Sequence, residues 1–318
     1  MNTTFNTVSE SIYTYACRED ELSLCQMELR ALFGAEAPAS LFKTDIRIDV
    51  SRSPFIKERI DVLYHGDKLA DIYEQVEQLD LAGATFKAIF VKTNDLAPAD
   101  KVEYAERRMI EREIGMHIEG EADISHPDLL FGIVALGGRW YFGPYHKNTA
   151  VWLHHMKKPR SYSIALSTRV ARAAVNIAVP RPEGIRAIDP CCGIGTVLVE
   201  ALSMGIDMVG RDINHFIARG ARENIAYFKL EGVVTRGDIA DITETYDAAI
   251  IDLPYNLYSK ITPEEQFSLL VHARRIAARV VVVSIEAVDE MIENAGFTIV
   301  DRCIAKKGLF SRHLLLCE

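Results

Sequence analysis

Four aspartates stand where four short runs in the second half of the chain come to an end. They are Asp189, Asp212, Asp238 and Asp252. Each of them alone is an ordinary turn former. The carboxyl ends of parallel strands share one edge of a sheet, where ligands bind, so the four carboxylates are expected to face one cleft. A carboxylate accepts hydrogen bonds from hydroxyl and amino groups, and the set therefore predicts a site for a nucleoside ligand.

A turn with two glycines follows the first of these strands. Residues 185–196 read IRAIDPCCGIGT, so an apolar strand ends at Asp189, Gly193 and Gly195 stand two apart, and a helix follows. Glycine lets a ligand approach the backbone, and a helix N-terminus offers free N–H groups to an anionic group. A dinucleotide fingerprint needs a third glycine, and Leu198 occupies its position. The pattern D-P-x-x-G-x-G-T resembles motif I of the class I S-adenosylmethionine (SAM) methyltransferases.

The spacing of the acids agrees with such a site. Asp212 lies 23 residues after Asp189, close to the interval of about 20 residues at which an acid of the second strand meets a ribose. Asp238 can accept a hydrogen bond from an adenine amino group, and Asp189 can face the cationic amino end of the methionine moiety. The predicted SAM-binding residues are Asp189, Cys191, Gly193, Gly195, Thr196, Asp212, Ile213, Asp238 and Ile239.

The sequence Asp252-Leu253-Pro254-Tyr255 follows an apolar run and resembles the D/N-P-P-Y/F/W motif of methyltransferases that modify exocyclic or amide nitrogens. The lone pair of such a nitrogen is delocalised, so a carboxylate and a turn carbonyl that accept its N–H bonds favour its attack on a sulfonium methyl. A tyrosine ring can stack on a flipped base. Asp252, Pro254 and Tyr255 are therefore the predicted catalytic residues. Leu253 replaces the first proline of the motif, which makes the turn less rigid.

The composition indicates a globular protein of about two domains. The chain has 318 residues, 49% of them hydrophobic, and a mean hydropathy near zero. No apolar run reaches membrane-spanning length and the first residues show no signal-peptide pattern, so we expect no membrane association and a cytoplasmic location. The six cysteines lack C-x-x-C spacing, which favours free thiols, and no histidine or cysteine cluster predicts a metal site.

A basic segment interrupts an acidic chain. The net charge is −9, whereas residues 139–187 hold nine Lys and Arg and one acid, a local charge of +8. Aromatic residues lie among them, and such a surface suits a phosphate backbone with stacked bases. The predicted RNA-binding residues are Lys157, Lys158, Arg160, Arg169 and Arg172. His154 and His155 are interpreted as structural, and Glu200 as a solvated or capping acid.

Residues 1–160 have the pattern of an α+β domain. The expected elements are a strand over 12–16, a helix over 22–33, a strand over 42–50, a helix within 56–81, a strand over 86–91, a helix over 99–114 and a hairpin around Gly137-Gly138. Residues 161–318 have the pattern of a doubly wound α/β domain. Ser167 is a suitable N-cap for its first helix, and strands then alternate with helices until a final hairpin. Seven strands in this order are the plan of a class I methyltransferase.

With these motifs placed, nearly the whole chain resembles the THUMP-domain RNA guanine-N2 methyltransferases of the tRNA guanosine-10 type. The segments that carry the resemblance are KPRSYSIALSTRVARAAVNIA, DPCCGIGT, GRDIN, ARENI and DLPY, and EADISHPDLLFGIVALGGRWYFG is similar to the end of a THUMP module. The resemblance implies SAM as cofactor, N2 of a guanosine in tRNA as methyl acceptor, and an N-terminal domain that grips the tRNA. Eukaryotic relatives use a small zinc-binding activator subunit, which makes such a subunit a second candidate partner.

The residues leave other functions open. The D-L-P-Y motif also fits an N6-adenine or a ribosomal-RNA guanine-N2 methyltransferase, because each presents an amine to the same turn. Because Leu253 departs from the motif, an RNA-binding protein that binds SAM without catalysis is a further alternative. An NAD-dependent oxidoreductase is disfavoured by the missing third glycine.

Overall fold

The computed structural model describes residues 10–37, 40–96, 101–161, 165–254, 261–307 and 310–318. The chain forms two compact units. One consists of Met1–Ala16, Ala37–Ser51 and Phe55–Thr149, and the other of Cys17–Glu36, Arg52–Pro54 and Ala150–Glu318. The chain therefore passes between the units several times before residue 150.

The division differs from the single boundary near residue 160 that the sequence suggested. Helix α1 (Leu22–Phe33) belongs to the second unit, because it packs against α5 (Thr168–Ala178) and β13 (Ile299–Lys307). Arg30 of α1 also pairs with Asp301 of β13 at 2.9 Å. A helix joins the unit that covers its apolar face, and the residues that cover this face lie far along the chain.

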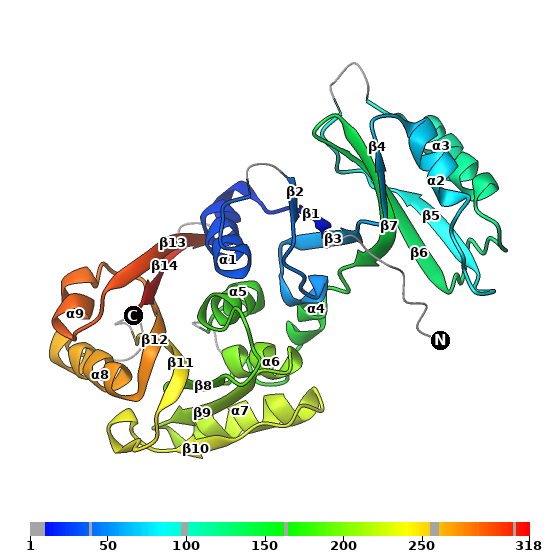
Figure 1. Cartoon of the computed structure of the whole chain (residues 1–318). Helices are drawn as coiled ribbons and strands as arrows, with labels where there is room; N and C mark the ends of the chain where they lie inside the picture. Colours follow the sequence, from blue (N-terminus) through cyan, green and yellow to red (C-terminus); the bar gives the residue numbers. More distant parts are fainter. Residues whose placement is uncertain (1–9, 38–39, 97–100, 162–164, 255–260, 308–309) are drawn as a thin grey trace. The chain divides into compact units, whose positions relative to one another are not determined.

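The first unit is built on a seven-stranded sheet with the order β2-β1-β3-β7-β6-β5, and β4 pairs with β7. Its strands are β1 (Ser11–Tyr15), β2 (Leu41–Thr44), β3 (Ile56–Asp61), β4 (Tyr64–Gly66), β5 (Phe86–Phe90), β6 (Leu129–Leu136) and β7 (Arg139–Lys147). Helices α2 (Leu69–Val76) and α3 (Tyr104–His117) lie side by side over this sheet (Figure 1). The predicted hairpin is confirmed: β6 and β7 are antiparallel, and Gly137 and Gly138 join them with φ of 61° and 73°.

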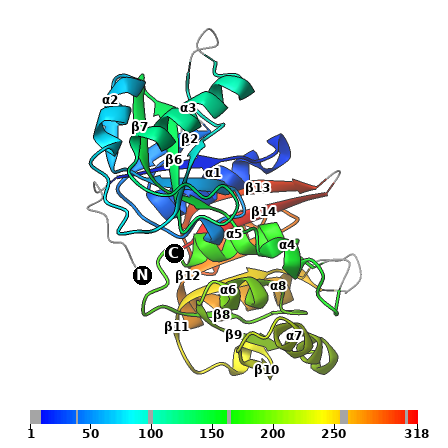
Figure 2. The ribbon, with the colours of Figure 1, turned by 90° about the vertical axis from the view of Figure 1, so that its right-hand side faces the viewer.

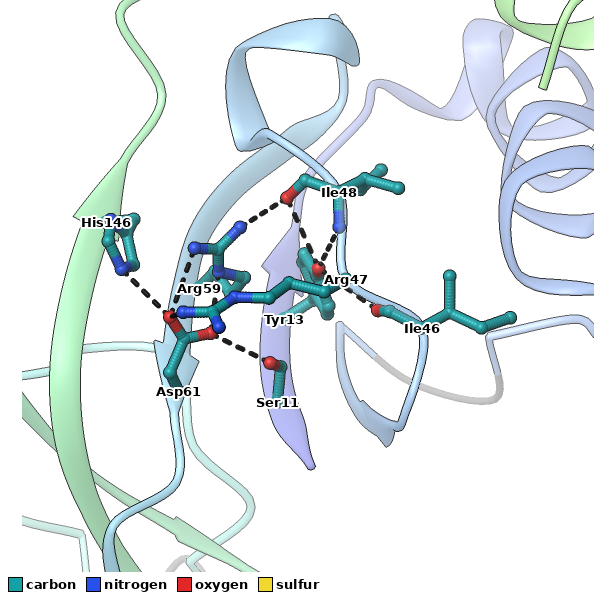
Figure 3. Close-up of polar contacts among 8 residues, drawn as sticks. All are labelled: Ser11, Tyr13, Ile46, Arg47, Ile48, Arg59, Asp61 and His146. Atoms are coloured by element: carbon teal, nitrogen blue, oxygen red, sulfur yellow. Dashed lines mark hydrogen bonds and ion pairs between the residues drawn. The ribbon is translucent and has the colours of Figure 1, made fainter. Parts of the chain in front are cut away.

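Asp61, at the end of β3, is buried at the centre of a polar cluster in this unit (Figure 3). Its carboxylate accepts hydrogen bonds from Ser11 Oγ at 2.8 Å and Arg59 Nη2 at 3.1 Å, contacts His146 Nε2 at 3.0 Å and pairs with Arg47. Burial alone would raise the pKa of Asp61, but the hydrogen bonds from His146 and Ser11 and the charges of Arg59 and Arg47 hold it well below its usual range. One ionised carboxylate thus joins β1, β3 and β7.

The same cluster explains why the strand expected over residues 42–50 ends at Thr44. Beyond it, the backbone bonds to side chains and not to a neighbouring strand. The N–H of Ile48 donates to the hydroxyl of Tyr13 at 2.9 Å, and its carbonyl accepts from Arg59 Nη1 at 2.5 Å (Figure 3). The prediction of a longer strand was wrong. It relied on the alternation of apolar residues in this segment, which does not show that side chains take up the backbone hydrogen bonds.

The second unit is a seven-stranded sheet with the order β10-β9-β8-β11-β12-β14-β13. Its strands are β8 (Arg186–Asp189), β9 (Asp207–Asp212), β10 (Val234–Arg236), β11 (Tyr246–Asp252), β12 (Ala277–Ser284), β13 and β14 (Phe310–Cys317), and its further helices are α4 (Trp152–His155), α6 (Thr196–Ser203), α7 (His215–Tyr227), α8 (Pro263–Ile276) and α9 (Asp289–Asn294). The strands from β10 to β12 are parallel, and β14 is antiparallel to both its neighbours.

This topology confirms the predicted class I methyltransferase plan. Helices α5 and α6 lie on one side of the sheet and α8 and α9 on the other (Figures 1 and 2). Val280–Val283 of β12 are fully buried, as a strand covered on both faces must be. The predicted cap is also confirmed, since Ser167 Oγ accepts a hydrogen bond from the N–H of Val170 at the start of α5. In the part of the chain that the structure describes, no helix is long and apolar enough to cross a membrane.

A buried carboxylate fixes α1 within the second unit. Glu28 accepts hydrogen bonds from Ser53 Oγ at 2.5 Å and from Asn176 Nδ2 of α5 at 2.7 Å. Burial raises the pKa of Glu28 from an ordinary 4.5 to about 7, against the lowering effect of these hydrogen bonds. The folded state therefore holds the proton more tightly than the unfolded state.

We expect Glu28 to make folding less favourable as pH rises. The folded protein binds the extra proton between pH 4.5 and about 7, so across this window the contribution of Glu28 to the free energy of unfolding falls by about 3 kcal/mol. Chemical denaturation of Glu28→Gln and the unaltered chain at pH 5 and pH 8 measures this. The variant should gain stability relative to the unaltered chain at pH 8. An equal difference at both pH values would contradict the expectation.

Candidate active site

The four strand-end aspartates come together at one cavity of the second unit. Asp189, Asp212 and Asp252 are the last residues of β8, β9 and β11, and Asp238 follows β10 by two residues. All four line a cavity of about 560 Å³, a volume typical of small-molecule sites. The parallel pairing of β8 with β9 and β11 places their carboxyl ends at this edge.

The first two acids also build the turn between β8 and α6. One carboxylate oxygen of Asp212 accepts the N–H of Gly193 at 2.9 Å and the other accepts the N–H of Asn214 at 2.8 Å. Asp189 accepts the N–H of Cys191 at 3.2 Å. These contacts tie the glycine turn to the end of β9, and each carboxylate keeps lone pairs for further donors.

The start of α6 leaves room and a polar group for a ligand. Gly193 has a φ of 55° and nothing within 4 Å of where a Cβ would be. Gly195 has a φ of 76°, and a Cβ there would lie 3.1 Å from the Cβ of Ala221. Thr196 lines the cavity, and its buried Oγ1 has no hydrogen-bond partner among the residues that the structure describes. A buried hydroxyl without a partner is costly, and a bound ligand would satisfy it.

Most of the predicted site residues lie in this cavity wall. The lining residues among them are Asp189, Cys191, Gly193, Thr196, Asp212, Ile213, Asp238, Ile239, Asp252 and Pro254. Gly195 is the N-cap residue of α6 and is not among the lining residues, and Tyr255 lies outside the described residues. Sequence reasoning missed the contribution of α8, whose residues Glu265, Ser268, Leu269 and His272 form another wall. Their spacing of three and four residues indicates that they share one face of a helix. The neighbouring sequence, however, does not show that this face lines a ligand site.

The cavity is strongly acidic. Its described lining residues include five acids and no Lys or Arg. Burial raises the pKa of Asp189 well above its usual range, and burial also raises the pKa of Asp212. Burial raises the pKa of Asp252 to about 7, against the opposing charge of Arg312. A positively charged ligand would lower these raised pKa values and stabilise the ionised carboxylates, so the lining suits a cation.

The turn after Asp252 is held at both ends. The N–H of Leu253 donates to the carbonyl of Val283 in β12 at 2.9 Å, and the Leu253 side chain is buried in the core. The carbonyl of Pro254 accepts a hydrogen bond from Gln266 Nε2 of α8 at 2.8 Å. A proline at position 253 would have no N–H to donate. Leucine at this position therefore adds a hydrogen bond to the sheet, where a proline ring would have stiffened the turn.

Part of the basic segment is neutralised by acids of the second unit. Arg160 pairs with Glu223, and Arg169 pairs with Glu21 at 3.2 Å. Lys157 is exposed and Lys158 is half-buried, which lowers the pKa of its amine. Of the five predicted RNA contacts, Lys157 and Arg160 are therefore the most exposed to a ligand.

Arg172 is a correction to the predicted RNA contacts. Its side chain is 2% exposed and pairs at 2.6 Å with Glu200, which is 0% exposed. Its guanidinium also lies 5.7 Å from the ring of Trp152. Glu200 is a buried acid and not a solvated one, and it also contacts His155 Nδ1 at 2.7 Å. The structural interpretation of His155 is confirmed. Arg172 can be buried because Glu200 of α6 supplies the opposite charge in the interior.

Comparison with known families agrees with this geometry. Residues 156–264 match the UPF0020 family, described as an RMKL-like methyltransferase domain. The match spans the strands that end in the four aspartates. The second unit contains a methyltransferase domain.

Two curated relatives come from archaea, and both are named tRNA (guanine(10)-N2)-dimethyltransferase. The protein of Methanothermobacter thermautotrophicus is 28% identical over 213 residues, which cover 63% of this chain and 61% of that protein. The protein of Pyrococcus abyssi is 30% identical over 207 residues, which cover 61% of this chain and 60% of that protein. Over the aligned part, the chain is similar to these two tRNA guanine-N2 dimethyltransferases. It spans about three fifths of the length of these relatives. Among solved structures, TrmN from Thermus thermophilus is 17% identical with a TM-score of 0.47, and the alignment covers 97% of this chain and 99% of that chain.

Proposed function

We propose that this relative of the tRNA guanine-N2 methyltransferases transfers a methyl group from SAM to N2 of a guanosine in tRNA, with guanosine 10 as the target. The observation that carries the proposal is that Asp252 and its turn share one acidic cavity with the three other strand-end aspartates. The nitrogen that accepts the methyl group and the cationic methyl donor can then bind next to each other in this cavity. The names of the relatives supply the base and the RNA class.

The residues of the cavity fit SAM. Asp212 would accept from the ribose hydroxyls, Asp238 from the adenine amino group, and Asp189 from the ammonium of the methionine moiety. Thr196 Oγ1, buried without a partner in the described part of the chain, would donate to the carboxylate of the methionine moiety at the N-terminus of α6. The excess of acids favours a cation over a neutral product.

Asp252 and the adjoining backbone would prepare the amine. When bound, SAM supplies a methyl group whose C–S bond breaks, with the electron pair left on sulfur, as the new N–C bond forms. Asp252 would accept one N–H of the guanine N2 and the carbonyl of Leu253 the other, which directs the nitrogen lone pair toward the methyl group. Asp252 would also receive the proton that N2 loses, and a pKa of about 7 suits that task.

The proposed RNA contacts of the second unit are Lys157, Lys158, Arg160 and Arg169, which lie in the segments that precede and begin α5. The α+β unit is proposed to act as the THUMP-like module that grips the tRNA, as the sequence predicted. A tRNA substrate is also the reason to propose a cytoplasmic location. An activator subunit stays a prediction.

Transfer of labelled methyl groups from SAM to unmodified tRNA transcripts tests the proposed function. The RNA is digested and the labelled nucleosides are separated. N2-methylguanosine or N2,N2-dimethylguanosine, lost when guanosine 10 is replaced by adenosine, is the expected result. N6-methyladenosine would retain the enzyme class and reject the substrate. SAM binding without any labelled nucleoside would reject catalysis by the isolated chain.

We expect Asp212→Ala to weaken SAM binding about 10- to 100-fold, because a hydrogen bond to a charged group contributes roughly 1.5–3 kcal/mol. Isothermal titration calorimetry with SAM measures this loss. Asp207→Ala is a matched control, since Asp207 lies on the same strand β9 at the end away from the cavity. An unchanged dissociation constant for Asp212→Ala would remove Asp212 from the site.

A further inference from the structure

The turn after Asp252 leaves one backbone torsion to be fixed from outside the turn. The φ of Leu253 is set by its N–H bond to Val283 at 2.9 Å, which continues the ladder between β11 and β12. Its ψ is restricted because the next residue is a proline. The φ of Pro254 is fixed by the ring. The ψ of Pro254 is determined neither by covalent geometry nor by the sheet, so the carbonyl that ends the turn needs a contact from outside to hold the turn in place.

Gln266 bonds to the group that this torsion orients. Its Nε2 donates to the carbonyl of Pro254 at 2.8 Å. Gln266 is 9% exposed, so this hydrogen bond is partly shielded from water, and a hydrogen bond shielded from water is stronger than one in solvent. Its neighbours on the cavity side of α8, Glu265 and Leu269, line the same cavity as Asp252.

The helix that presents Gln266 has a firmly held first turn. Pro263 occupies its first position, and Thr262 and Glu265 form a capping box with hydrogen bonds of 3.2 and 2.8 Å. Leu270 and Ala273 on its inner face are fully buried. Gln266 therefore projects from a rigid element onto the turn, which is the arrangement that a positioning group requires.

We propose that Gln266 is a positioning residue for methyl transfer, which holds the Asp252-Leu253-Pro254 turn in the geometry that receives the acceptor amine. This inference rests on the proposed function of the site. It also accounts for Leu253: two hydrogen bonds, one from Leu253 and one from Gln266, hold a turn that a second proline would otherwise stiffen. Gln266 does not touch the reacting atoms and acts through the backbone.

The variant Gln266→Met isolates the donor, because methionine has similar length and volume and cannot donate a hydrogen bond. We expect kcat on tRNA to fall roughly 10- to 100-fold, since a shift of about 1 Å at a reacting group is enough for such a loss. The dissociation constant for SAM should stay within about twofold, because the proposed SAM contacts come from β8, β9 and the segment after β10, whereas Gln266 bonds to the turn after β11. Glu264→Gln is the matched control from the same helical turn, exposed and outside the cavity lining.

The variant Gln266→Glu adds a readout that a loss of packing would not give. A protonated carboxyl can donate to the Pro254 carbonyl, whereas a carboxylate repels it. The kcat of this variant relative to the unaltered chain should therefore be several-fold higher at pH 5.5 than at pH 8. The ratio for Gln266→Met should not change with pH.

Three outcomes would overturn the inference. The first is an unchanged kcat for Gln266→Met. The second is a loss of SAM affinity and a lower melting temperature in Gln266→Met together with its loss of kcat. The third is a kcat of Gln266→Glu, relative to the unaltered chain, that does not vary with pH. Failure of the proposed function is seen separately, in the nucleoside that the unaltered chain methylates. The kcat ratios are measured on that nucleoside, whichever it is.

Discussion

An Asp252→Asn protein is expected to bind SAM and to transfer its methyl group about 100- to 1000-fold more slowly than the unaltered chain. Asparagine keeps the shape of the side chain but presents an amide in place of the negative charge. It can accept one hydrogen bond, yet it cannot stabilise the positive charge that develops on the attacking nitrogen or take up its proton. Single-turnover transfer from labelled SAM to tRNA measures the rate of the chemical step.

Asp247→Asn is the control for this change. Asp247 lies on the same strand β11, at the end away from the cavity, where it is exposed and accepts the N–H of Arg186 at 2.8 Å. Its replacement should leave the transfer rate within about twofold. A transfer rate for Asp252→Asn close to that of the unaltered chain would show that the carboxylate has no part in the reaction, and the assignment of the turn would have to be abandoned.

The second large effect is expected for stability. Arg172→Ala should lower the free energy of unfolding by about 3–5 kcal/mol, because it leaves Glu200 buried without its cationic partner. Glu200 is 0% exposed, so water cannot replace the guanidinium. Glu200 also contacts His155 Nδ1. Urea denaturation at pH 7, followed by circular dichroism, gives the difference in midpoint and slope.

Arg160→Ala provides the comparison for a pair at the surface. Arg160 is 58% exposed and pairs with Glu223, and pairs of this kind contribute at most about 1 kcal/mol. The double replacement Arg172→Met with Glu200→Leu should recover much of the loss, since an apolar pair of similar volume can replace a buried ion pair. An Arg172→Ala protein as stable as Arg160→Ala would contradict the burial of this pair.

The chemistry of the site could be predicted from short stretches of sequence. Each apolar strand that ends in an aspartate places a carboxylate at the carboxyl edge of a parallel sheet, and this edge is common to all such strands. The glycine turn before α6 and the turn after Asp252 are likewise local features. For these residues the fold adds little beyond bringing the strand ends together in one cavity.

The tertiary structure alone decided the remaining features. Arg172 stands in a basic segment that reads as an RNA surface, and only its meeting with Glu200 of α6 buries it. The membership of α1 in the second unit, and the hydrogen bond from Gln266 to Pro254, depend on residues brought near by folding. Periodicity in a sequence shows which face of an element is apolar, but the partner that covers a face or neutralises a charge is set by packing.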